Sequence, residues 1–131
     1  MCNYMNKYSY KPMPLYNIGI LHIMDFQDVD MSTLLFSYMP CEKTSVPVYS
    51  FLITGPDIPP MIVDTGAKES DFEYLKKRYR LNPTKKPYQT IEAQLQRFGY
   101  RPEDIGVVLH THLHLDHCGQ DDLFPNAKII F

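Results

Sequence analysis

Four side chains that can bind a metal ion fall within six consecutive positions in the last quarter of the sequence. They are His112, His114, Asp116 and His117. The chain has only 5 histidines among its 131 residues, so chance places this pattern in roughly one such sequence in two thousand. Imidazole and carboxylate groups are common donors to divalent metal ions in proteins. The cluster therefore predicts a metal-binding loop.

The alternating spacing of the first two histidines explains how they can share one ion. Residues two apart in an extended backbone point the same way, so His112 and His114 are expected to converge on a first metal. Leu113 and Leu115 alternate with them. We expect both leucines to point into the core and to hold the loop in place.

Asp116 and His117 are expected to bind a second ion. Because the two residues are adjacent, their side chains are expected to diverge from the first pair and to reach a metal nearby. Two neighbouring ions can share a hydroxide, lower the pKa of bound water and polarise a carbonyl or phosphoryl oxygen. A donor set without thiolate favours zinc, with manganese or iron as alternatives.

The segments that must position this loop begin as strands. Apolar, partly β-branched runs bounded by turn residues predict strands, and a buried strand at 106–109 leads directly into the histidines. Gly55-Pro56 predicts a turn, so the sheet is expected to begin as an antiparallel meander. The strands predicted in this way cover residues 15–24, 31–39, 46–54, 61–63, 106–109 and 128–131.

Helical spacing appears in the middle of the chain. Phe72, Leu75 and Tyr79 recur at intervals of three and four, which predicts an amphipathic helix over residues 70–80 that ends before Asn82-Pro83. A second helix is predicted over 90–98, capped by Thr90 and stopped at Gly99. A single turn is predicted at 101–104, and residues 121–124 are expected to close a short helix.

Two motifs together resemble the metallo-β-lactamase superfamily. Its hallmark, Thr/Ser-His-x-His-x-Asp-His, is matched by residues 111–117, and its Asp-Thr-Gly turn is matched by residues 64–66. The resemblance implies an α/β (α+β) fold, namely the N-terminal half of an αββα sandwich with a mixed, largely antiparallel sheet and flanking helices. It also implies that Asp64 supports the histidine loop by hydrogen bonding rather than by binding metal.

Within that superfamily the sequence looks like the N-acyl homoserine lactonase-like branch. The supporting stretches are residues 48–53, 101–105, 114–119 and 123–127. The resemblance implies hydrolysis of a lactone ester by a hydroxide that two zinc ions activate, with Asp116 moving a proton to the leaving alkoxide. A thioesterase of the glyoxalase II type, which shares the six-residue motif, is the alternative.

The resemblance covers only the first half of the family fold. We expect residues 1–14 to be an N-terminal extension and residues 15–131 to be a metallo-β-lactamase-like domain truncated on its C-terminal side. In the family, the second half supplies a third histidine for one ion, a bridging aspartate and a last histidine for the other. A second interpretation is therefore that the chain alone is a non-catalytic half-domain. A homodimer, in which a second copy supplies the missing metal ligands, is one way to complete the site.

Composition limits the classes of partner. A 44% hydrophobic and 21% charged chain with a net charge of −2 has no basic surface for nucleic acid. No apolar segment is long enough for a signal or a membrane span, and the cysteines are odd in number and scattered. We expect a cytoplasmic protein that acts on a small ester or lactone. We expect His22 to be a packed or hydrogen-bonded residue, His110 to be a strand-end residue and Cys118 to be a small packed side chain, rather than ligands.

Overall fold

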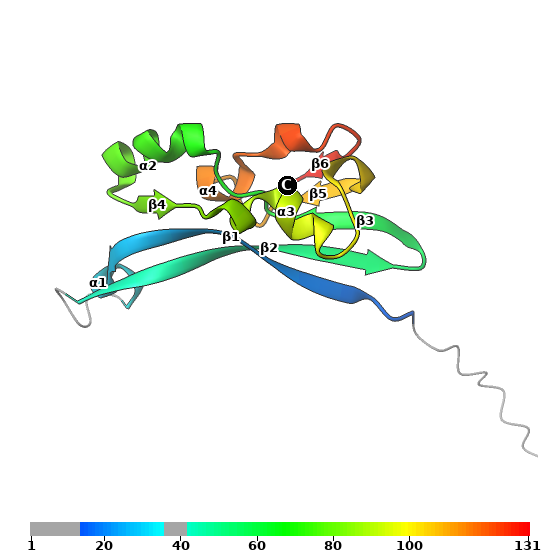
Figure 1. Ribbon diagram of the computed structural model, residues 1–131, viewed down its shortest axis with the longest axis horizontal. Helices are drawn as coiled ribbons and strands as arrows, with labels where there is room; N and C mark the ends of the chain where they lie inside the picture. The colour runs from blue at the N-terminus through cyan, green and yellow to red at the C-terminus, as the bar shows by residue number, and fades with distance from the viewer. Residues whose placement is uncertain (1–13, 36–41) are drawn as a thin grey trace, which may run out of the picture.

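The computed structural model describes residues 14–35 and 42–131, which form one curled six-stranded sheet with short helices (Figure 1). The sheet order is β4-β1-β2-β3-β5-β6. The strands are β1 (Asn17–Asp30), β2 (Lys43–Gly55), β3 (Ile58–Val63), β4 (Asn82–Thr84), β5 (Val107–Leu109) and β6 (Lys128–Ile130). Strands β4, β1, β2 and β3 pair antiparallel, whereas β3, β5 and β6 pair parallel. The expected mixed, largely antiparallel sheet is confirmed.

The long strand β1 has one buried face because its side chains alternate. Leu21 and Ile23 are almost completely buried, whereas Ile18 and Ile20 are more than half exposed. A bulge between His22 and Met24 shifts the register against β2. Beyond the bulge, the strand twists and buries residues on both faces.

Short helices cover one side of the β1–β2 ribbon, the upper side in Figure 1. They are α2 (Phe72–Tyr79), α3 (Ile91–Gln96) and α4 (Leu115–Cys118), with single 3₁₀ turns at Glu69–Asp71, Pro87–Gln89, Pro102–Asp104 and Asp121–Leu123. In α3, the Ala93 amide donates to Thr90 Oγ1 at 3.2 Å. Gly99 follows with φ of 80°, a conformation that glycine adopts without strain. The predicted helices at 70–80 and 90–98, and the cap and stop of the second, are confirmed.

The strand predicted over residues 31–39 is wrong in its described part. Residues Met31–Leu34 form a single helical turn, α1, in which Asp30 caps the start by accepting a hydrogen bond from the Ser32 amide at 2.8 Å. Residues 36–41 lie outside the described part of the chain, as do residues 1–13 of the expected N-terminal extension. A short apolar run fits a helix or a strand equally well, and here the local cap decides.

Strand β4 was not expected from the sequence. Asn82 and Pro83 were interpreted only as the end of a helix, but Arg80 ends α2 with φ of 57°. The chain then pairs with β1 through Phe26↔Pro83 and its neighbours. Pro83 has no amide hydrogen to donate and sits in the edge strand of the sheet, where proline is tolerated.

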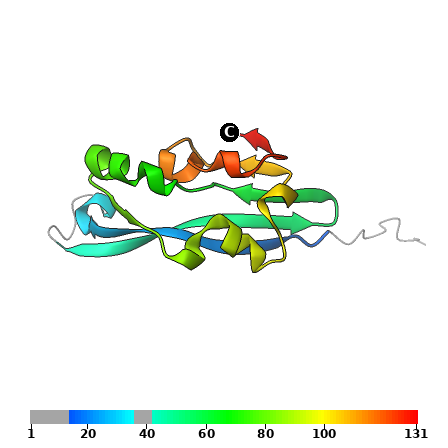
Figure 2. The same ribbon diagram turned by 45° about the horizontal axis from the view of Figure 1, so that its top comes forward.

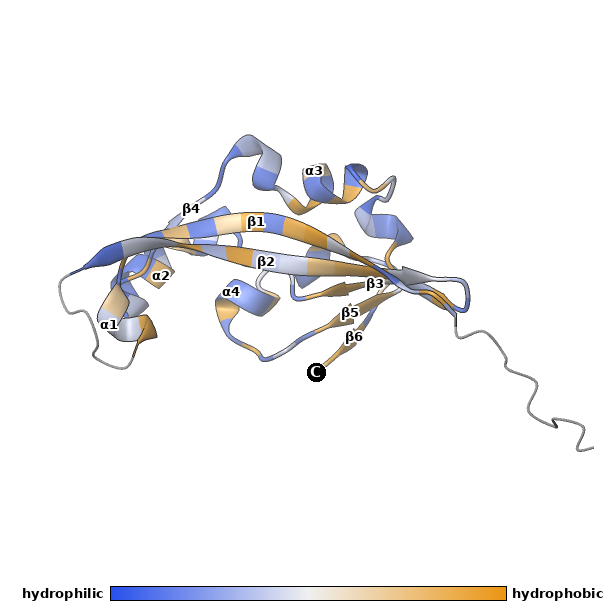
Figure 3. Cartoon of the chain, turned by 90° about the horizontal axis from the view of Figure 1, so that it is seen from below, coloured by the Kyte–Doolittle hydropathy of each residue, from blue (hydrophilic) through white to orange (hydrophobic). Residues whose placement is uncertain are grey.

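The core lies between the sheet and the helices, and the opposite face of the ribbon is apolar and open. Figure 3 views the ribbon from that side and shows alternating hydrophobic residues along β1 and β2. Ile18, Ile20, Tyr49 and Phe51 are exposed there by 38% or more. Within residues 14–35 and 42–131 there is no helix long and apolar enough to cross a membrane.

Candidate metal centre

The histidine loop begins where two parallel strands end together. Asp64 directly follows β3, and Thr111 follows β5 after one intervening residue. The Asp64 amide donates to Leu109 O at 2.9 Å, which continues the strand pairing into the loop. Figure 2 shows the two strands side by side, with α4 near their ends. The fold therefore brings the Asp-Thr-Gly turn to the histidine motif, as the two motifs together imply.

Asp64 accepts hydrogen bonds from both ends of the loop. Its Oδ1 accepts from the Thr111 amide at 2.9 Å, and its Oδ2 accepts from Thr111 Oγ1 at 2.8 Å. His117 Nδ1 also lies 2.8 Å from Oδ2. Burial opposes ionisation of Asp64, but the hydrogen bonds from His117 and Thr111 outweigh it and lower the pKa of the carboxyl. An ionised carboxylate only accepts, so Nδ1 of His117 donates to Asp64, and Nε2 is the nitrogen that Asp64 does not engage.

His112 and His114 converge as the spacing predicts. His112 Nε2 lies 3.0 Å from His114 Nδ1, and their ring centres are 4.5 Å apart. Two nitrogens bound to one tetrahedral zinc ion at roughly 2.0–2.1 Å lie roughly 3.4 Å apart. Both side chains are exposed, so an ion can reach them. The two nitrogens fit one metal ion with little movement.

The second pair lies closer to the first than expected. The ring centre of His117 is 4.0 Å from that of His112, and His117 Nε2 is 3.6 Å from Asp116 Oδ2. Helix α4, which begins right after His114, turns His117 back toward the strand end. The rings of His112 and His117 therefore lie side by side, and the expectation that His117 and Asp116 reach a second ion stays a prediction.

The two leucines of the motif behave differently from each other. Leu115 packs against the hydrophobic core, as expected, whereas Leu113 is 58% exposed, so its expected burial is wrong. The backbone leaves the extended conformation at α4, and strict alternation does not continue through the loop. Leu115 alone anchors the loop to the core.

The four donors form pairs rather than a closed site. Across residues 14–35 and 42–131, no three His, Cys, Asp or Glu side chains are arranged so that they could hold one ion. His112 with His114, and His117 with Asp116, each provide two donors of the imidazole and carboxylate type that zinc accepts. The donor chemistry fits zinc, and the assignment of these residues as ligands stays a prediction.

A small cavity opens beside the loop. It has a volume of about 150 Å³. Its wall is mostly apolar and comes from α2, the segment after α2 and the first residues of α4. His114 and Asp116 of the histidine motif contribute to the same wall. The lining residues are Leu75, Tyr79, Leu81, His114, Leu115 and Asp116. The sequence identified the helix face but not its closeness to the histidines.

His22 and His110 contact carboxylates of the fold, and that they and Cys118 do not bind metal stays a prediction. His22 contacts Asp25 Oδ1 at 2.8 Å, and His110, whose side chain is fully buried, contacts Asp121 Oδ2 at 3.0 Å. Burial, helped by nearby carboxylates, raises the pKa of the half-buried Cys118 thiol. The role of Asp121 was missed, since its partners lie 11 and 56 positions away in sequence.

Comparison with known proteins agrees with the motifs. Residues 44–130 match the model of the metallo-beta-lactamase superfamily. An N-acyl homoserine lactonase from Bacillus cereus is 32% identical over 108 residues, which is 78% of this chain and 43% of that protein.

Solved structures agree as well. An N-acyl homoserine lactone hydrolase, with the product N-hexanoyl-L-homoserine at its catalytic metal center, superposes with a TM-score of 0.72 at 25% identity, over 86% of this chain and 46% of that one. A mutant of B. thuringiensis AiiA with N-decanoyl-L-homoserine bound at its active site gives a TM-score of 0.70 at 25% identity and the same coverage. The chain spans less than half the length of these relatives. It belongs to the metallo-β-lactamase superfamily and is N-acyl homoserine lactonase-like within it.

Proposed function

We propose that this protein is a metal-dependent hydrolase that opens the lactone ring of N-acyl homoserine lactones. The observation that carries the proposal is the 3.0 Å approach of His112 and His114 nitrogens beside a His117 that Asp64 orients. The similarity to lactonases supports the substrate class. Membership in the superfamily implies a hydrolase, and the choice of a lactone is the part that needs testing.

Each loop residue has a distinct role in this proposal. His112 and His114 would hold one ion, and His117 with Asp116 would hold a second. When bound, the ions lower the pKa of water and polarise the ester carbonyl. Asp64 keeps His117 in the tautomer whose Nε2 can bind metal. Since Asp64 already accepts three hydrogen bonds, it is a support for the ligands and not a ligand itself.

Asp116 is the candidate for proton transfer. Hydrolysis joins the water oxygen to the carbonyl carbon and breaks the ring C–O bond. It also delivers a proton from the water to the departing alkoxide, which becomes a hydroxyl group. Asp116 is half-buried at the start of α4 and lines the cavity with His114. A carboxylate at that place can carry the proton between the two oxygens.

The cavity suits the acyl part of such a substrate. Leu75, Leu81 and Leu115 give it an apolar wall, and His114 and Asp116 stand at the same cavity. An acyl chain packed there would leave the ester next to the metal-ligand loop. This arrangement favours a substrate that carries an apolar chain attached to a hydrolysable ring.

Hydrolysis of N-hexanoyl homoserine lactone by the purified chain tests the proposal. We expect zinc-loaded protein to release the ring-opened acid, a chelator to reduce the rate at least about tenfold, and added zinc to restore it. His112→Ala with His114→Ala should remove zinc binding and hydrolysis, while His22→Ala, a histidine far from the motif in sequence, should keep both. Hydrolysis that is indifferent to the chelator would contradict the metal mechanism.

A second candidate function follows from the pairing of the donors. With two donors for each ion, the chain alone is expected to bind zinc weakly and to act as a non-catalytic metal-binding half. Zinc content per chain separates the two candidates. Two tightly bound ions with lactone hydrolysis support the enzyme, whereas weak binding without hydrolysis supports the half-domain. Faster hydrolysis of a thioester than of the lactone would move the proposal to the thioesterase branch.

A further inference from the structure

A cluster of buried polar side chains lies directly beneath the metal-ligand loop. Asp64, Thr65, His110 and Gln120 are each exposed by 8% or less. Burying polar groups lowers stability unless every group finds a partner. A core built only for stability would place apolar residues here, so the cluster calls for another reason.

Asp121 is the residue that joins this cluster together. Its Oδ1 accepts a hydrogen bond from Thr65 Oγ1 at 2.8 Å, and its Oδ2 lies 3.0 Å from His110 Nε2. Thr65 belongs to the turn after β3, and His110 is the residue after β5. One carboxylate therefore ties together the ends of the two strands that carry the two halves of the site.

The contacts of Asp121 continue to the ligand His117 along two routes. The Thr65 amide donates to the backbone carbonyl of His117 at 2.6 Å. On the other route, His110 directly precedes Thr111, whose amide and hydroxyl donate to Asp64, and Asp64 holds His117 Nδ1. His110 Nδ1 itself lies 3.6 Å from Asp64 Oδ1, beyond hydrogen-bond distance, and has no hydrogen-bond partner among the described residues. Asp64 itself has φ of 60°, a backbone conformation that costs energy for a residue with a side chain and needs outside support.

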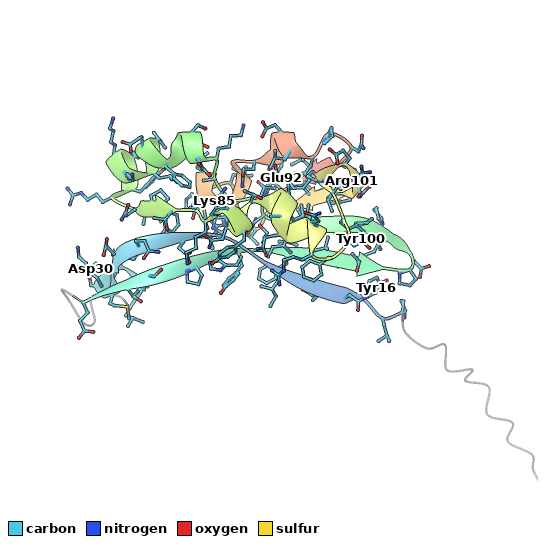
Figure 4. The ribbon with its side chains drawn as sticks, in the orientation of Figure 1. Tyr16, Asp30, Lys85, Glu92, Tyr100 and Arg101 are labelled. Carbon is cyan, nitrogen blue, oxygen red and sulfur yellow. The ribbon has the colours of Figure 1, made fainter. Side chains whose placement is uncertain are left out.

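Gln120 and Lys85 extend the same support outward. The Gln120 amide donates to Thr65 Oγ1 at 3.2 Å, and Lys85 Nζ donates to Ala67 O at 3.2 Å and to Gln120 Oε1 at 3.4 Å. Lys85, labelled in Figure 4, lies on the helix-covered side of the ribbon. Burial lowers the pKa of its ammonium group. Placing a lysine there is costly unless its contacts with the turn matter.

We propose that Asp121 is a positioning residue for the metal-ligand loop, acting through Thr65 and His110 to fix Asp64 and, through it, the tautomer and orientation of His117. The inference rests on the proposed metal site. Groups that orient a ligand from behind change metal affinity without touching the ion. Asp121 is absent from the superfamily hallmark used above, so the sequence resemblance did not assign it this role.

Asp121→Ala compared with Asp122→Ala tests the proposal in the 131-residue chain. The two changes remove the same charge at neighbouring positions, but Asp122 is exposed and its carboxylate pairs with Lys68 at 2.9 Å. We expect Asp121→Ala to weaken zinc binding roughly tenfold and Asp122→Ala to change it less than about twofold. Circular dichroism and thermal melting of the metal-free proteins check that each variant is folded.

The tautomer of His117 gives a readout that needs no metal. Nitrogen-15 NMR at one fixed pH should show His117 with its proton on Nδ1 in the parent and in Asp122→Ala, and a mixture of tautomers in Asp121→Ala. A residue that only stabilised the fold would lower the melting temperature and leave this tautomer unchanged. If the parent binds no zinc, the proposed function fails, yet the tautomer comparison still decides the role of Asp121.

A second pair of variants keeps the test decisive if Asp121→Ala does not fold. In His110→Gln the amide nitrogen reaches the place of Nε2 and can still donate to Asp121, so the parent tautomer and affinity should be kept. His110→Ala should behave like Asp121→Ala. Equal zinc affinity and the same His117 tautomer in the parent, His110→Ala and Asp121→Ala would overturn the proposal.

Discussion

Two imidazole–carboxylate pairs in this protein look alike but stand in different surroundings. His22 and Asp25 form a pair on β1, and His117 and Asp64 form a pair at the metal-ligand loop. Each has a nitrogen–oxygen distance of 2.8 Å. In both pairs the carboxylate is buried and hydrogen bonds lower its pKa against the opposing effect of burial. Distance and burial alone therefore do not separate a structural pair from a functional one.

The difference lies in which nitrogen is engaged and in what faces the other side of the ring. His22 directs Nε2 to both Asp25 and Gln89, and its ring packs on Tyr49 with centres 5.2 Å apart. His117 uses Nδ1 for Asp64, and its Nε2 lies near Asp116. Both rings are thus engaged by the fold at one nitrogen, but the remaining nitrogen of His117 faces a second candidate metal donor, Asp116. The His22 pair is a structural element of the fold.

The largest effect is expected from removing the carboxylate of the loop pair. Asp64→Ala deprives Thr111 and His117 of a buried acceptor, so we expect a loss of unfolding free energy on the order of 3 kcal/mol. We also expect zinc affinity to fall roughly 10- to 100-fold. Urea unfolding of the metal-free protein and zinc titration measure the two effects separately.

Asp25→Ala is the matched control for that change. It removes an equally buried carboxylate and leaves His22 and Gln89 without their partner, which should lower the unfolding free energy by about 2 kcal/mol. Zinc affinity should stay within about twofold of the parent. A parallel fall in zinc affinity in both variants would show that the two pairs are not independent and that the His22 pair also supports the metal site.

Acid should weaken the His22 pair in a predictable direction. Burial raises the pKa of Asp25, but hydrogen bonds from Gln89 and His22 and the charge of Lys86 lower it by more. The net result is a pKa below the ordinary value of 3.8. A carboxyl with a lowered pKa in the folded state stabilises the fold above its unfolded value, and this stabilisation is lost as the pH falls through the folded value.

Unfolding free energies measured between about pH 6 and pH 2 check this sign. The parent should lose stability below about pH 4, and Asp25→Asn, which cannot ionise at this position, should be less stable at pH 6 but should lose less on acidification. Asp64 contributes with the same sign, so part of the loss remains in the variant. Identical acid profiles for the two proteins would refute the assignment to Asp25.

The sequence alone identified much of the site because its signals are local. The donors lie within six positions, and the Asp64 turn and the Thr90 cap depend on residues close in sequence or on a motif. The packing of His22 also followed from its place in an apolar strand. Local chemistry and hydrophobic period were sufficient for these features.

What the sequence missed depends on contacts between distant segments. The partners of Asp121 are remote in sequence, and β4 forms only because β1 offers an open edge to Asn82–Thr84. Leu113 lies before α4 and is exposed, because alternation alone does not tell whether the side opposite the histidines faces the core or the solvent. The helical turn at Met31–Leu34 was missed for a local reason, because apolar composition outweighed the Asp30 cap in the interpretation.

The smallest effects on stability are expected when a histidine ring is replaced by an amide that keeps the hydrogen bond to its partner carboxylate, Asp25 or Asp64. A Gln amide nitrogen reaches the position of imidazole Nε2, and an Asn amide nitrogen reaches that of Nδ1. His22→Gln therefore keeps the contact with Asp25, and His117→Asn keeps the contact with Asp64. Because no buried acceptor loses its donor, each change should cost less than about 1 kcal/mol of unfolding free energy.

Zinc titration then separates the two otherwise similar variants. His22→Gln should bind zinc like the parent, because the nitrogen it replaces already faces Asp25 and Gln89 inside the fold. His117→Asn should lose an ion, because the nitrogen it removes is the one that Asp64 leaves free. If both variants bind zinc like the parent, the contact with Asp64 serves the fold alone, and the two pairs are equivalent.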